Sequence, residues 1–147
     1  MRRLIIALAV AVLARPLVGC TRGIRIQISG PITEPTFTFL GEGLFSRRLA
    51  SVDGLSIIDV TSVHRRSIWS LSRDHPTCEP AQPLRYGVVP RGWRVLEPAH
   101  RLEPGRTYAL TASGCAFYGG IVFKIRNGSV VFRDGNGDAP IQEVQGL

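Results

Sequence analysis

The chain has 147 residues, of which 18 are Lys or Arg and 11 are Asp or Glu, so its formal net charge is +7. This length predicts about one domain, large enough to bury a hydrophobic core, and argues against a multidomain protein. Lys124 is the only lysine, and no run exceeds two basic residues. We therefore interpret most of the arginines as a solvated surface.

The first nineteen residues predict a cleaved secretory leader. Two arginines follow Met1, and residues 4–13, LIIALAVAVL, contain no polar side chain. A helix needs about 20 residues to span a bilayer, so this short apolar run is typical of a signal peptide. The pair Arg2-Arg3 leaves a twin-arginine signal as an alternative, although only Met1 precedes it.

Leu17-Val18-Gly19-Cys20 follows the apolar run and resembles the lipobox of bacterial lipoproteins. The resemblance implies diacylglyceryl attachment to the Cys20 thiol, cleavage before Cys20 and acylation of the new amino terminus. Several acyl chains hold a protein firmly on a membrane. Thr21, where a retained inner-membrane lipoprotein has Asp, implies an outer-membrane protein facing the periplasm. An ordinary signal peptide with a cysteine near its end is the alternative.

Eight segments show strand signals, mostly apolar residues alternating with polar ones. Prolines leave no room for a long helix, and the best helical window, residues 44–51, is short. Asn127-Gly128 predicts a tight hairpin turn before the last strand. The predicted strands are residues 23–29, 36–40, 56–63, 67–72, 84–88, 108–112, 121–125 and 129–133.

These strands predict an all-β domain, either a sandwich or a barrel. Residues 102–110, LEPGRTYAL, resemble the LxPGxxYxL run of fibronectin type III and related immunoglobulin-like domains. The resemblance implies a tyrosine corner, in which Tyr108 bonds back to the backbone after Leu102, with Trp69 in the core. Both remaining cysteines follow Trp69, which departs from the immunoglobulin pattern. We predict an immunoglobulin-like β-sandwich of seven or eight short strands.

The expected organisation is a leader at residues 1–19, the lipidated Cys20 with a tether through residue 23, a sandwich at residues 24–133 and a tail at residues 134–147. With Cys20 acylated in an oxidising compartment, Cys78 and Cys115 are expected to form a disulfide. A zinc site at Cys78 with His75 is the alternative, but no CxxC or HxxxH accompanies them.

Other candidate sites have weaker patterns. His64, His75 and His100 are scattered with no GxSxG, so we expect no catalysis. Asp134, Asn136 and Asp138 imitate the start of a calcium loop, yet Ala139 and Gln145 occupy positions that need Gly and Glu. We expect a polar turn there. Three glycines are expected between the last predicted strands, with no helix after them, so they do not predict a phosphate site: Gly114, Gly119 and Gly120. The aromatic residues beside them fit a core better than a ligand platform; these are Phe117, Tyr118 and Phe123.

The sequence thus predicts a lipid-anchored, non-catalytic envelope protein with a structural or protein-interaction role. We expect the membrane as one partner through the acyl anchor, an envelope protein as another, no cofactor and, given secretion, no nucleic acid. The alternatives are a calcium-dependent module and a binding module for an envelope glycan or polyanion. The polyanion site would use Arg47, Arg48, Arg65 and Arg66.

Overall fold

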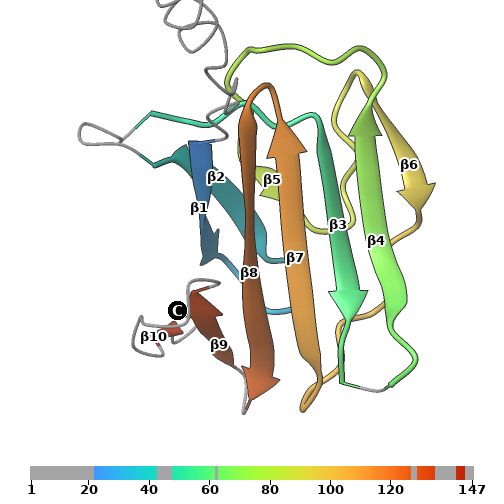
Figure 1. Cartoon of the computed structure of the whole chain (residues 1–147). Helices are drawn as coiled ribbons and strands as arrows, with labels where there is room; N and C mark the ends of the chain where they lie inside the picture. Colours follow the sequence, from blue (N-terminus) through green and yellow to red (C-terminus); the bar gives the residue numbers. More distant parts are fainter. Residues whose placement is uncertain (1–21, 43–47, 62, 127–128, 135–141, 145–147) are drawn as a thin grey trace, which may run out of the picture.

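The computed structural model describes residues 22–42, 48–61, 63–126, 129–134 and 142–144. Within these ranges the protein is all-β, as predicted, with ten strands and no helix (Figure 1). The strands are β1 (Arg22–Ser29), β2 (Thr36–Gly41), β3 (Gly54–Asp59), β4 (Arg66–Arg73), β5 (Leu84–Arg85), β6 (Trp93–Glu97), β7 (Thr107–Gly114), β8 (Phe117–Arg126), β9 (Ser129–Asp134) and β10 (Gln142–Val144).

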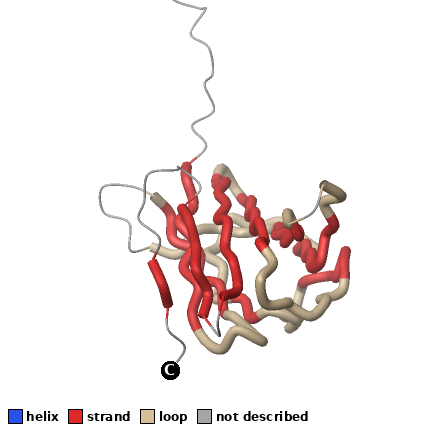
Figure 2. Tube along the Cα trace, turned by 90° about the horizontal axis from the view of Figure 1, so that it is seen from below, coloured by secondary structure: helices blue, strands red, loops and turns tan. Residues whose placement is uncertain are grey.

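The strands form one mixed sheet that curls into a half-barrel (Figure 2). Its main path runs β5-β2-β1-β8-β7-β3-β4-β6, and β9 and β10 branch from β8. The β1–β8 pair is parallel and joins Arg22 to Phe117 and Gly23 to Tyr118. The other strand pairs are antiparallel. The first described strand is therefore held by a strand from near the end of the chain.

The hydrophobic core fills the inside of the curl. The three isoleucines of β1 are buried and alternate with exposed polar side chains, as the sequence pattern predicts. Phe37 of β2 packs against Trp69 of β4 and Phe123 of β8, with ring centroids 6.4 and 6.3 Å apart. Strands that are distant in hydrogen-bonded order thus share one core.

A glycine allows β1 to cross from β8 to β2. After pairing with β8 through Gly23, β1 pairs with β2 from Ile24 onward. A Cβ atom on Gly119 of β8 would lie 2.3 Å from the backbone oxygen of Ile24. Because a side chain does not fit at that distance, Gly119 permits the close passage of β1 over β8.

The expectation that the late glycines lie between strands is wrong. Gly114 ends β7, and Gly119 and Gly120 lie within β8. Gly114 also meets a neighbouring backbone, since its Cβ would lie 2.4 Å from the carbonyl oxygen of Ser51. These glycines serve close backbone packing, a role that composition alone does not reveal.

The predicted hairpin near the C-terminus is confirmed, but it does not contain the last strand. β8 and β9 are paired over six residues, with Arg126 opposite Ser129 at one end and Ile121 opposite Asp134 at the other. The turn residues 127–128 lie outside the described ranges. β10 then pairs with β9 inside the predicted tail. Two of its three residues are polar, so its sequence carried no strand signal.

Three other elements differ from the sequence prediction. β6 was missed because it is an edge strand that leaves Val95 and Leu96 exposed. β5 is shorter than predicted because Gly87, at a φ of 77°, turns the chain away. β3 ends at Asp59 rather than residue 63, since the Asp59 carboxylate accepts the Thr61 N–H at 2.9 Å and turns the backbone.

Two predicted boundaries also overlap the sheet. β1 begins at Arg22, inside the predicted tether, and the described part of the predicted helical window is extended. In that window Leu49 bridges Leu40 and Ser51 bridges Pro80. These bridges tie the segment before β3 to the rest of the domain.

Candidate functional site

The corner between β6 and β7 has the geometry that the LxPGxxYxL run implies. The Tyr108 side chain is buried, and its hydroxyl accepts the backbone N–H of Glu103 at 2.8 Å. Leu102 is buried beside it, and the Tyr108 ring packs against Phe123 with centroids 5.5 Å apart. Burial raises the pKa of Tyr108. The hydroxyl fixes the corner through its hydrogen bond with Glu103.

An ion pair borders the same corner. Arg106 donates to the Asp59 carboxylate at 2.8 Å and pairs with Glu103. Burial raises the pKa of Asp59, but hydrogen bonds from Thr61 and Arg106 and the arginine charge outweigh it, so this pKa lies below its ordinary 3.8. Asp59 consequently remains ionised and ties the end of β3 to the corner, which is a stabilising role.

The disulfide lies at the opposite end of the strands. Cys78 and Cys115 are bonded, with their Cα atoms 5.1 Å apart, as predicted. Cys115 and Ala116 form the turn between β7 and β8, and Ala116 has a φ of 60°. The Ala116 carbonyl accepts the Arg22 N–H at 2.7 Å. The bridged turn therefore also holds the start of β1.

A polar network near this end was not foreseen from the sequence. Arg73, at the end of β4, donates to Thr77 at 2.6 Å and lies 3.7 Å from the Asp53 carboxylate. Its guanidinium also stands 5.4 Å from the Trp93 ring centroid, a cation–π contact. Asp53 in turn accepts the Thr77 N–H at 3.0 Å. These partners are far apart in sequence, so no local motif announces them.

Beside this network is a depression of about 510 Å³, lined by Arg73, His75, Arg91 and Trp93 among others. Asp74 and Glu79 also line it, so its charges are mixed. Of its two arginines, Arg73 is already engaged by Thr77 and Asp53. The network is best explained as a structural connection that joins the end of β4 and the start of β6 to the disulfide-bearing loop.

A second depression, of about 370 Å³, covers the glycine pair of β8. Tyr118 and Val122 border it, and Glu42 lies at its edge. Of the aromatic residues considered for this region, Phe123 is in the core and Phe117 packs against it, while Tyr118 is 59% exposed. The core interpretation thus holds for Phe123 and, in part, for Phe117, whereas Tyr118 is an exposed strand residue that lines the depression.

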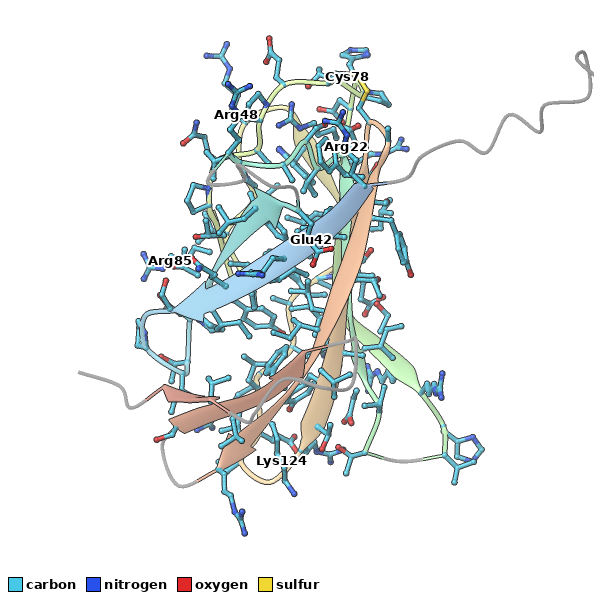
Figure 3. The ribbon with its side chains drawn as sticks, turned by 60° about the vertical axis from the view of Figure 1, so that its left-hand side comes forward. Arg22, Glu42, Arg48, Cys78, Arg85 and Lys124 are labelled. Atoms are coloured by element: carbon cyan, nitrogen blue, oxygen red, sulfur yellow. A yellow bond between two sulfur atoms is a disulfide. The ribbon has the colours of Figure 1, made fainter. Side chains whose placement is uncertain are left out.

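The candidate polyanion arginines do not form one cluster. Arg48 precedes the start of β3, whereas Arg65 is in the turn after its end and Arg66 begins β4. A strand of six residues separates the two groups by about 20 Å. All three side chains are exposed, and Arg47 lies outside the described residues. Figure 3 shows Arg48 near Cys78 and far from Lys124, which is at the other end of the molecule.

The three histidines are also separated. His64 is in the β3–β4 turn and His75 follows β4, while His100 Nε2 lies 2.9 Å from the Glu97 carboxylate after β6. No group of three or more His, Cys, Asp or Glu suited to a metal occurs among the described residues. Asp134 ends β9, whereas Asn136 and Asp138, with the predicted lipidation residue Cys20, lie outside the described ranges.

Comparison of the chain with protein-family models, with curated proteins and with solved structures finds no match. In the part of the chain that the structure describes, no helix has the length and apolar character needed to cross a membrane.

Proposed function

We propose that this protein is a lipid-anchored, non-catalytic component of the bacterial cell envelope, with a structural or protein-interaction role. The observation that carries the proposal is the distribution of the three cysteines. Cys78 and Cys115 are bonded to each other, which leaves Cys20, in Leu17-Val18-Gly19-Cys20, as the thiol available for acylation. The apolar run before it supplies the export signal.

The disulfide supports the same compartment. Disulfides persist in secreted and periplasmic proteins and are rare in the reducing cytosol. A bond between Cys78 and Cys115 closes a loop with a sequence separation of 37 residues, so it constrains much of the domain. A protein whose fold includes this bond is suited to a position outside the inner membrane.

The fold that we propose at finer detail is an immunoglobulin-like sandwich. Its support is the Tyr108 hydrogen bond to Glu103 and the contact of Phe37 with Trp69, which packs β2 against β4. In this interpretation β1, β2 and β5 form one layer and β8, β7, β3 and β4 form the other. Such domains present loops at both ends, and these loops are the expected contact surfaces for an envelope partner.

The anchor is tested by replacing Cys20 with serine. The wild-type protein should incorporate radiolabelled palmitate, partition into detergent and start at an acylated Cys20 by mass spectrometry. Cys20→Ser should remain an unlabelled, full-length precursor. The matched control is Cys78→Ser/Cys115→Ser, which loses the two disulfide-bonded cysteines yet should keep the label. Processing and membrane association of Cys20→Ser equal to wild type would rule out the lipoprotein assignment.

The interaction role is tested by cross-linking the native lipoprotein in intact cells and identifying the partners that copurify. We expect an envelope protein whose cross-links map to exposed loops. Binding to purified envelope polysaccharide that weakens as salt rises, with no protein cross-link, would instead favour the polyanion module.

A further inference from the structure

The start of the described sheet is close in sequence to the proposed anchor. Arg22 is only two residues after Cys20, and it is already part of β1. A fully extended chain covers at most about 3.6 Å per residue, so the backbone of Arg22 lies within about 7 Å of the acylated residue. Thr21 is the one residue between Cys20 and β1, so the sequence offers little length for the domain to move away from the lipid.

Arg22 is also firmly attached to the domain. The Arg22 N–H donates to the Ala116 carbonyl, and the Gly23 carbonyl accepts the Glu42 N–H at 2.9 Å. Beyond that point β1 pairs with β2 over six residues and buries three isoleucines. Pulling β1 free would expose these side chains, so the anchor is connected to a rigid element.

The two ends of the domain differ in their distance from this attachment. The hairpin end, defined here by Arg22, Arg48, Cys78 and Ala116, contains the start of β1 and the β7–β8 turn (Figure 3). The corner end, defined by Val63, Arg65, Lys124 and Arg126, contains the β3–β4 turn and the end of β8. The ten residues of β8 separate the ends by about 30 Å.

We infer, from the one-residue spacing between Cys20 and β1, that the acyl anchor holds the hairpin end against the lipid headgroups and directs the corner end away from the membrane. The inference rests on the proposed lipidation of Cys20. Exposed charges near the start of β1 have both signs, since Arg22 and Arg48 are exposed and so is Glu42, whose N–H bonds to Gly23. The short tether, rather than net charge, therefore sets the orientation.

The test uses the full acylated protein in phospholipid vesicles that carry a nickel-chelating lipid. One spin label is placed at an exposed residue of each end, as Arg48→Cys and Lys124→Cys, without reducing the native disulfide. Nickel at the headgroups should relax the label at position 48 several-fold more than the label at position 124. Glu42→Cys and Arg126→Cys provide a second pair if either first variant fails to fold.

A tether variant is the matched control. Inserting ten Gly and Ser residues between Thr21 and Arg22 should make the two labels respond about equally. Mass spectrometry separates the two ways to fail. Absence of acyl chains on Cys20 refutes the proposed function, whereas equal relaxation at both ends of an acylated protein refutes the orientation alone. A difference that survives the insertion would show that the tether is not its cause.

Discussion

Replacing Tyr108 with phenylalanine removes one hydroxyl from the corner and nothing else. The ring keeps its place against Phe123, while the backbone N–H of Glu103 loses the acceptor that it now has at 2.8 Å. Leaving a buried donor unsatisfied costs about 1–3 kcal/mol. Because Glu103 is itself exposed, water compensates in part, and we expect a loss of about 1–2 kcal/mol.

For a domain of this size that loss lowers the melting temperature by about 4–8 °C. The assay is urea unfolding of the oxidised protein, monitored by intrinsic fluorescence. The slope of the unfolding free energy against urea concentration should be the same in variant and wild type. Tyr118→Phe is the matched control, since Tyr118 is 59% exposed and its change should stay within about 0.5 kcal/mol.

Leu102→Ala should cost about 2–5 kcal/mol, because it leaves a cavity in the same corner. The two sites are in one corner, so the double variant should lose a free energy different from the sum of the single losses. If Tyr108→Phe costs no more than Tyr118→Phe, the hydroxyl does not hold the corner and the strongest support for the immunoglobulin-like fold is lost.

The remaining predictions concern the strand crossing, the disulfide and the loss of stability at acidic pH. Gly119→Ala should lose about 3 kcal/mol, since its Cβ would lie 2.3 Å from a backbone oxygen, whereas Gly54→Ala, with contacts of 3.6 Å or more, should stay within about 1 kcal/mol in urea melts. Reduction should destabilise the wild type by about 4 kcal/mol, as expected for a loop of 37 residues, and should leave the melting temperature of Cys78→Ser/Cys115→Ser unchanged. The lowered pKa of Asp59 stabilises the fold above pH 3.8, and this contribution is lost as pH falls through the folded-state pKa. Between pH 5 and pH 3 the free energy of unfolding of Asp59→Asn should therefore fall less than that of the wild type. An equal fall in the two proteins would contradict this role of Asp59.

The strands that bury one face were predictable from alternation. In β1 and β2 a shift of one residue would expose every isoleucine or phenylalanine, so the pattern specifies both strand and register. β6 has no such pattern, because its edge position leaves Val95 and Leu96 in solvent. β10 depends on β9 for its backbone partners, and that dependence is not visible in three residues of sequence.

The candidate sites divide in the same way. The corner around Tyr108 was predictable because its residues are adjacent in sequence, and the disulfide because only two cysteines remained once Cys20 was assigned to the anchor. The Arg73 network was not predictable, since Asp53 and Trp93 reach it from 20 residues before and 20 after along the chain. Likewise, the separation of Arg48 from Arg65 follows from the direction of β3, which composition does not encode.

The pairing of β1 with β8 has a consequence for the order of folding. β1 is the first of the described strands, yet its parallel partner is the eighth, so this contact forms only after most of the polypeptide has been synthesised. Until then β1 has only its hairpin with β2, and an isolated hairpin is marginally stable in water. Domains dominated by such distant pairings fold in about milliseconds to seconds. β1 therefore lacks its β8 partner until late in synthesis, and that contact closes beside the disulfide at the β7–β8 turn.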